Sequence, residues 1–248
     1  MLNVAVFMAF LVPTIAPAQS KSTQLSGVVN SNQDGDRQPD DSLTLREAIA
    51  LVNGQLPIES LSEAEKAQVK QLSADAPSRI DFNLPPNQTI IRLNERLPNL
   101  ASPGLVIDGT TQPGYDATKS ATAEIAIPIP VVEIAPATNK EILRGLTIVA
   151  DGITVRGLSI YGFGETPQVP TLSTPPADIF IAHKQPPPDI SQQQPPNSSF
   201  PFSDTDVPPR NIVIENNWLG ITSSENAPDR LSAFGVSVCN SVGPPVRR

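Results

Sequence analysis

The feature that most constrains the fold is a short repeat within residues 144–164. The run Arg144-Gly145-Leu146-Thr147-Ile148 returns twelve residues later as Arg156-Gly157-Leu158-Ser159-Ile160, with Gly152-Ile153-Thr154-Val155 between them. Each run alternates apolar and polar residues and carries a glycine at or near its start, which predicts very short strands joined by tight turns. Because no run is long enough to bury a face alone, each strand must stack on a neighbouring copy.

Further short apolar runs extend this pattern along the chain. They occupy residues 24–29, 79–82, 89–93, 105–107, 131–134, 178–182 and 211–221. The pattern resembles the right-handed parallel β-helix, and the low aromatic content of 4% suits a core of stacked Ile, Val and Leu. We therefore expect an all-β fold, a right-handed parallel β-helix (solenoid) with an N-terminal α-helical cap and a long proline-rich insertion.

Residues 1–18 predict an export signal. They contain an apolar run without charge, and Ala16-Pro17-Ala18 supplies a small-x-small cleavage pattern. The run is too short, and too interrupted by Pro13, to predict a membrane span. Met1-Leu2-Asn3 lacks the basic residue of an ordinary signal, which leaves a buried N-terminal strand as the alternative. We expect a secreted or cell-surface protein.

A capped helix is predicted near the start of the mature chain. Thr44 and Glu47 have the spacing of a capping box, an apolar stripe follows, and Gly54 suits the left-handed position that ends a helix. The run Leu43-Thr44-Leu45-Arg46-Glu47-Ala48 resembles the CSLREA segment of exported bacterial β-helix proteins, with Leu43 where that family carries Cys. The resemblance implies a pectate-lyase-like superfold whose open end is covered by this helix. Arg46 and Glu47 are expected to form a local polar pair.

Two further segments resemble the same proteins. The turn at residues 107–115 and the run at 211–221 match them, so the resemblance covers most of residues 24–221 outside the proline-rich insertion. Asn216 and Asn217 suit a bend, because Asn tolerates left-handed backbone and can bond to neighbouring strands. The resemblance implies an architecture and leaves the activity open, since β-helix proteins include polysaccharide lyases and glycoside hydrolases.

The chain divides into five expected segments. They are an export signal (1–18), a cap with the amphipathic helix and a surface helix near 61–74 (19–78), the first coils (79–164), a proline-rich extruded loop (165–210) and further coils (211–248). A second capping box, Ser62 with Glu65, begins the surface helix. No closing element follows the last coil, so we expect a truncated chain or a fragment of a longer protein.

The loop after the first predicted strand offers candidate calcium ligands. Asn30, Asn32, Asp34 and Asp41 fall at positions 1, 3, 5 and 12 of a calcium-loop template, with Gly35 at the sharp turn. Asn at the first position and the short Asp at the last depart from that template. A solvated polar turn that binds no cofactor is the competing interpretation, and we favour it.

Candidate catalytic residues are few. Acids occur on or beside the predicted strands at Asp81, Asp108, Glu133, Asp151 and Glu215. Asp108 and Asp151 are the most suggestive, since strands stacked about 4.8 Å apart could bring two acids to the separation of an inverting hydrolase. Each also belongs to an Asp-Gly pair, a common turn dipeptide, and we favour that interpretation. We therefore expect no catalytic residue.

Composition limits the partners. A net charge of −8 argues against sequence-independent binding to nucleic acid and against binding to an anionic membrane surface. The single histidine, His183, has no nucleophile motif around it, and the single cysteine, Cys239, allows no intrachain disulfide. We expect an exported, adhesin-like surface scaffold that binds an extracellular glycan or surface protein without catalysis. A polysaccharide lyase or glycoside hydrolase with stacked carboxylates is the alternative.

Overall fold

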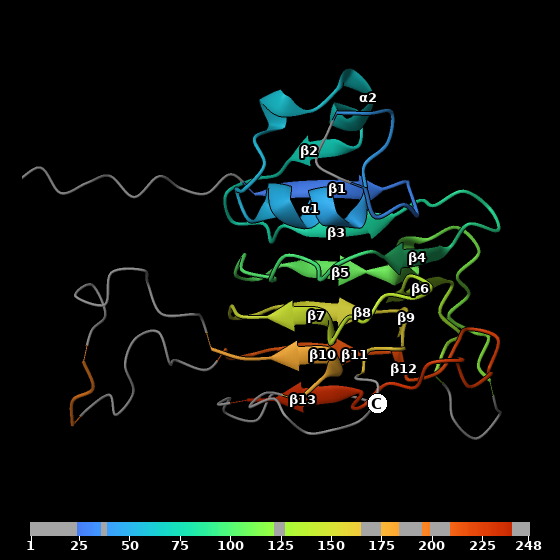
Figure 1. The fold of residues 1–248 in the computed structure, drawn as a ribbon. Helices are drawn as coiled ribbons and strands as arrows, with labels where there is room; N and C mark the ends of the chain where they lie inside the picture. The colour runs from blue at the N-terminus through green and yellow to red at the C-terminus, as the bar shows by residue number, and fades with distance from the viewer. Residues whose placement is uncertain are drawn as a thin grey trace, which may run out of the picture.

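A computed structural model shows the arrangement of the chain (Figure 1). It describes residues 24–35, 39–121, 127–164, 175–183, 195–198 and 209–239. The predicted export signal and most of the predicted proline-rich loop lie outside the described residues.

Short strands dominate the described part of the chain. The strands are β1 (Leu25–Val29), β2 (Val69–Gln71), β3 (Arg79–Phe82), β4 (Ile90–Leu93), β5 (Val106–Asp108), β6 (Val132–Pro136), β7 (Arg144–Ile148), β8 (Thr154–Arg156), β9 (Leu158–Ile160), β10 (Ala177–Ile181), β11 (Val213–Glu215), β12 (Trp218–Leu219) and β13 (Val236–Val238). The helices are α1 (Leu45–Val52), α2 (Glu63–Lys66) and the 3₁₀ turns η1 (Ile58–Ser60) and η2 (Gly109–Thr111).

These strands form three sheets. The first has the order β11-β8-β5-β3-β1-β2, the second β13-β10-β7 and the third β12-β9-β6-β4. Among the described strands every pairing is parallel except that of β1 with β2, which is antiparallel. The chain visits the sheets in turn: β5, β6 and β7 are followed by β8, β9 and β10, and then by β11, β12 and β13.

This topology corrects the expected fold class. An all-β, right-handed parallel β-helix is wrong as the class, because the first sheet mixes parallel and antiparallel strands. The architecture is a mixed, multi-sheet arrangement with few helices. The difference arises at residues 61–74, where the predicted helix stops at Lys66 and Val69–Gln71 pairs antiparallel with β1 as β2. This pairing covers the edge of β1 that would otherwise expose unpaired backbone.

Alternate residues of the first sheet face the core. Ile80, Ile107, Val155 and Ile214 occupy one register column across four neighbouring strands, and each is at most 4% exposed. Side chains in a strand alternate between the two faces of a sheet, so the residues on either side of this column face the other way. Burial of this column gives each short strand the apolar contact that it cannot make alone.

The capped helix is confirmed at its residues. The hydroxyl of Thr44 accepts a hydrogen bond from the backbone N–H of Glu47, whose carboxylate accepts from the backbone N–H of Thr44. Gly54 follows the helix with φ = 70°, the left-handed conformation expected of it. Arg46 and Glu47 do not pair with one another, since Glu47 bonds to Thr44 while Arg46 reaches Asp34.

Close packing explains the glycines of the repeat. A Cβ atom on Gly145 would lie 2.5 Å from the carbonyl oxygen of Asp178 on the neighbouring strand. Gly157 has φ = 69°, and a Cβ there would lie 2.8 Å from the backbone nitrogen of Thr110. The repeated Arg-Gly pair therefore marks two places where backbone of an adjacent segment, after the repeat for Gly145 and before it for Gly157, approaches too closely for a side chain.

Asn216 and Asn217 form a bend between β11 and β12. Asn216 has φ = 53°, and the side chain of Asn217 donates to the Val155 carbonyl and accepts from the Leu158 backbone N–H. The expected role of this pair is thus confirmed. Within the described residues, no helix has the length and apolar character needed to cross a membrane.

Replacing Ile107 with Ala tests the buried column. Loss of its methyl groups from a fully enclosed site should lower the free energy of unfolding by about 2–5 kcal/mol. Val106 precedes it on β5 and is only partly buried, so V106A is the matched control and should cost less than about 1 kcal/mol. Urea unfolding of both variants gives the comparison, and equal losses would contradict the assignment of the two faces.

Candidate functional site

A column of charged side chains crosses the outer face of the first sheet. Asp81, Asp108, Arg156 and Glu215 occupy successive register positions on β3, β5, β8 and β11. Each of these residues is adjacent, on its own strand, to a residue of the buried apolar column. Its side chain therefore points to the opposite face of the sheet. Arg79, two residues before Asp81, completes the group.

Asp108 is the centre of this column. Its Oδ2 accepts from Arg79 Nη2 at 2.9 Å and from Arg156 Nη2 at 2.5 Å, and its Oδ1 accepts from the backbone and hydroxyl of Thr110. Burial alone would raise the pKa of this carboxyl, which is 2% exposed, but Arg156, Thr110 and Arg79 outweigh burial and lower the pKa to about 2. Asp108 is therefore ionised at neutral pH with both oxygens occupied.

Asp151 lies apart from Asp108. Thr154 on β8 pairs with Val106 on β5. Asp151 lies three residues before Thr154, whereas Asp108 lies two residues after Val106. Asp151 lies in the turn before β8, where its backbone carbonyl accepts from the backbone N–H of Gly104, four residues before Asp108. Asp151 is exposed, and its carboxylate accepts from the backbone N–H of Arg210. The structure therefore does not bring the two predicted candidates together.

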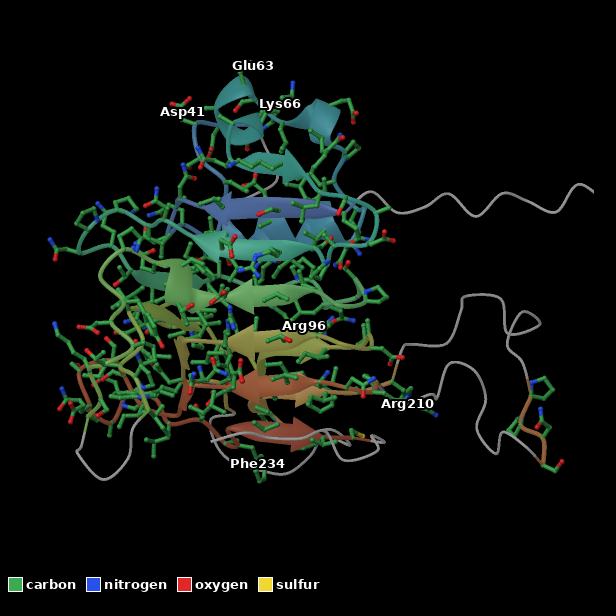
Figure 2. All side chains as sticks on the ribbon, turned by 180° about the vertical axis from the view of Figure 1, so that it is seen from behind. Asp41, Glu63, Lys66, Arg96, Arg210 and Phe234 are labelled. Carbon is green, nitrogen blue, oxygen red and sulfur yellow. The ribbon has the colours of Figure 1, made fainter. Side chains whose placement is uncertain are left out.

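Three of the four candidate calcium ligands already accept hydrogen bonds from protein donors through their side-chain oxygens, Asn32 from the side-chain amide of Gln33 at 3.0 Å. The side-chain oxygen of Asn30 accepts from the Leu43 backbone N–H at 2.7 Å, and the Asn32 amide donates to the Ile90 carbonyl at 3.3 Å. Asp34 accepts from Arg46 Nε at 2.7 Å and Nη2 at 2.9 Å. Asp41 is exposed at the end of the molecule that carries α2 (Figure 2).

Arg46 competes directly with a metal ion for Asp34. The two side chains are 7% and 1% exposed, and Arg46 also donates to the carbonyls of Glu95 and Arg96. Within the residues that the structure describes, no group of three or more His, Cys, Asp or Glu side chains is placed to hold a metal ion. The geometry therefore favours a structural role for Asp34.

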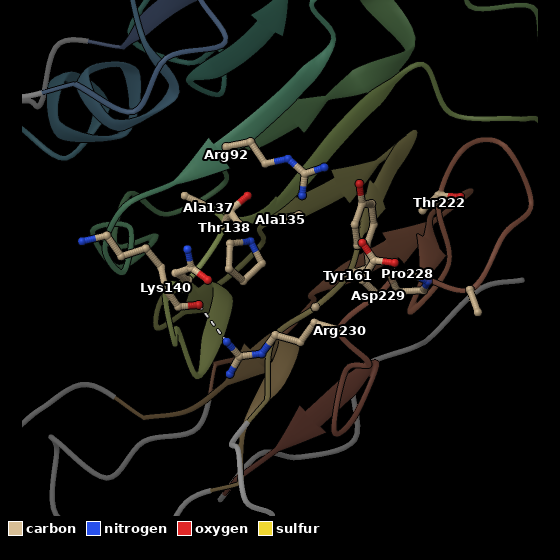
Figure 3. Close-up of a pocket in the computed structure, with 14 residues that line it drawn as sticks. Arg92, Ala135, Ala137, Thr138, Lys140, Tyr161, Thr222, Pro228, Asp229 and Arg230 are labelled. Atoms are coloured by element: carbon tan, nitrogen blue, oxygen red, sulfur yellow. Dashed lines mark hydrogen bonds between the residues drawn. The ribbon is translucent and has the colours of Figure 1, made fainter.

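A cleft of about 360 Å³ lies between the third sheet and residues 221–235, which we term the closing loop (Figure 3). Its lining residues come from β4, the end of β6 and the turn after it, the residues after β9, and the closing loop; they are Arg92, Ala135, Pro136, Ala137, Thr138, Asn139, Lys140, Tyr161, Gly162, Thr222, Ala227, Pro228, Asp229 and Arg230. Three of them are basic and one is acidic. The cleft is thus locally basic on an acidic chain.

A hydrogen-bonded cluster supports one wall of the cleft. The Tyr161 hydroxyl donates to Glu133 Oε2 at 2.6 Å, and the Ser223 hydroxyl donates to Glu133 Oε1. The Arg92 guanidinium lies 6.0 Å from the centre of the Tyr161 ring. Burial and the Glu133 contact raise the pKa of Tyr161, so its hydroxyl stays protonated at neutral pH and is a poor general base.

A second buried carboxylate anchors the closing loop. Asp178 on β10 is fully buried, and its Oδ1 accepts from the Ser232 hydroxyl at 2.5 Å. Ser232 in turn accepts from the backbone N–H of Gly162. Burial raises the pKa of Asp178 to about 7, and its hydrogen bonds offset only part of that effect.

The cleft and the buried site of Asp178 were not predicted from the sequence. Arg92, Lys140 and Arg230 lie far apart in the sequence and meet only in three dimensions. Asp178 carried a usable signal, because it is an acid inside the apolar run Ala177–Ile181. A charged residue in such a run is either exposed or specifically accommodated. Comparison of the chain with protein-family models, curated proteins and solved structures gives no match.

Replacing Asp34 with Ala should destabilise the fold whether or not calcium is present. The buried Arg46 guanidinium would lose its buried carboxylate and keep only the exposed carboxylate of Glu95 at 3.3 Å, at a cost of about 3 kcal/mol. Asp41→Ala, which removes another predicted calcium ligand at an exposed site, should cost less than about 0.5 kcal/mol. Thermal unfolding with calcium and with chelator decides between the roles. A calcium-dependent rise in Tm that both variants abolish would restore the metal site.

Asp178 should make stability depend on pH. Its native pKa of about 7 lies above the ordinary value of 3.8, so between these values the native state holds a proton that the unfolded state releases. This contribution to stability is complete below about pH 4 and is lost as pH rises to 7, by on the order of 4 kcal/mol. Asp178→Asn should remove that slope in urea unfolding at a series of pH values. Asp151→Asn, at an exposed site, should leave it intact, and an unchanged slope in D178N would rule out Asp178 as its origin.

Proposed function

We propose that the chain is an exported surface scaffold that binds an extracellular partner without catalysing a reaction. The observation that carries the proposal is the state of Asp108. This acid is shared between two arginines and has a pKa of about 2, so it has no proton to give at neutral pH and no free oxygen with which to accept one. Ion pairing of this kind stiffens a sheet face and leaves it without acid–base chemistry.

The other acids near the sheets support the same role. Glu133 accepts from Tyr161 and Ser223, and Glu215 lies 3.8 Å from the Arg156 guanidinium. These carboxylates hold strands and the closing loop in place. A scaffold needs that rigidity, since a preordered surface loses little entropy when a partner binds.

The partner is expected to be a glycan or another surface protein. The net charge of −8 disfavours nucleic acid, and the charged column mixes both signs, so it presents no strong single-sign field. Export is supported by the apolar, uncharged start of the sequence.

One observation favours a second candidate, a glycoside hydrolase or polysaccharide lyase. The pKa of Asp178 is raised to about 7, which is the property of a general acid at neutral pH. Against this role, Asp178 is fully buried beneath Ser232, so a substrate would reach it only after the closing loop moved. We therefore rank the scaffold first.

A turnover assay separates the two candidates. The full chain is incubated with anionic and neutral polysaccharides, with and without calcium, and both unsaturated and reducing ends are measured, because lyases form the former and hydrolases the latter. No product above the heat-denatured control is expected, while retention of the chain on immobilised polysaccharide or on a surface protein would show binding.

Three variants locate the residue responsible for any activity that the assay detects. Turnover that is lost in Asp178→Asn would establish the enzyme with its acid at that position. Turnover lost in Asp108→Asn or Asp151→Asn would instead place the chemistry on the first sheet. Any of these outcomes would overturn the scaffold.

A further inference from the structure

The arginines of the cleft beside the closing loop differ from the other arginines described above in their pairing with carboxylates. Arg46, Arg79 and Arg156 each have a carboxylate within 3 Å. Arg92 is exposed, and among the described residues no carboxylate forms an ion pair with it; its contact is the Tyr161 ring. The positive charge of Arg92 is therefore not matched by an acid of the described structure.

The opposite side of the cleft carries a second guanidinium. Arg230 donates to the carbonyls of Lys140 and Gly164, and its nearest carboxylate, Glu141, lies 3.9 Å away and is half-exposed. Its Nε is buried and has no hydrogen-bond partner. Figure 3 shows Arg92 and Arg230 on opposite sides of the lining residues, with Ala135 labelled between them.

The walls hold these groups in place. Arg230 is fixed by two carbonyls, the closing loop is anchored through Ser223 and Ser232, and Tyr161 is fixed by Glu133. Arg230 is thus preordered, while Arg92 is exposed beside the Tyr161 ring. Each guanidinium is a planar fork of N–H donors that matches the oxygens of a carboxylate, sulfate or phosphate. A volume of about 360 Å³ is at the small end of ligand sites and suits a compact molecule.

We infer that this cleft binds a small polar ligand through an oxyanion group, with Arg92 and Arg230 on either side of the anion and Lys140 at the rim. The inference rests on the proposed role as a binding protein and adds the ligand class and the site. Asp229, the acid among the lining residues, disfavours ligands with several negative charges close together. A sugar, or a molecule of similar size, that carries one oxyanion matches this distribution of basic and acidic side chains.

Isothermal titration of the full chain at low ionic strength tests the inference. Glucose 6-sulfate, glucose 6-phosphate and glucuronate are compared with glucose, so that the three oxyanions are distinguished from one another and from the sugar body. At least one acidic sugar should bind while glucose does not, and added salt should weaken that binding. Arg92→Gln should weaken it about tenfold or more, because a charge-assisted contact is lost.

Two further variants control for charge and folding. Lys119→Gln removes the same charge from an exposed side chain outside the cleft and should leave the affinity unchanged. Lys140→Gln should weaken binding less than Arg92→Gln, since Lys140 lies at the rim. Arg230 anchors the closing loop and is left intact, and near-ultraviolet circular dichroism checks that each variant is folded.

The outcomes separate this inference from the proposed function. Equal binding of glucose and the acidic sugars, no binding of any of the four, or equal effects of Arg92→Gln and Lys119→Gln would overturn the oxyanion site while the scaffold proposal stands. Binding of an acidic sugar accompanied by its turnover would keep the site and overturn the absence of catalysis.

Discussion

The structure depends on the stacking of very short parallel strands in register. Three-residue strands such as β5 and β8 bury too little apolar surface to be stable alone, and each is held by the strands on either side of it in the same sheet. Register matters because a shift by one residue would exchange Ile107 and Val155 for Asp108 and Arg156 in the core. The apolar and charged columns are two consequences of one alignment.

Local sequence signals predicted the individual elements well. The strand runs, the Thr44–Glu47 capping box and the Asn216–Asn217 bend are set by interactions between near neighbours, and the structure has them where the residues indicate. The helix near 61–74 failed for an equally physical reason. Its capping box is formed, but the chain gains more by pairing Val69–Gln71 with the edge of β1 than by continuing a largely polar helix. That choice also changed the fold class.

The candidate site could be predicted only in part. Asp108 was found because it stands on a strand, yet its low pKa depends on Arg79 and Arg156, which lie 29 and 48 residues away in the sequence. The cleft depends on the path of the closing loop, which carries no periodic pattern. Charge patterning along a sequence cannot show which arginines lack an acid in three dimensions, and that property distinguishes Arg92 from Arg46.

The antiparallel pairing of β2 with β1 limits where further parallel strands can be added to the first sheet. A strand that adds in parallel needs an edge strand whose backbone N–H and C=O groups are not yet paired. Beside β1 that position is taken by β2, which runs in the opposite direction. In the first sheet, a parallel strand can therefore be added at an edge only beside β11, at the other end of the strand order (Figure 1). The β1–β2 edge of the first sheet is therefore closed to further parallel strands, and growth of that sheet is confined to one direction.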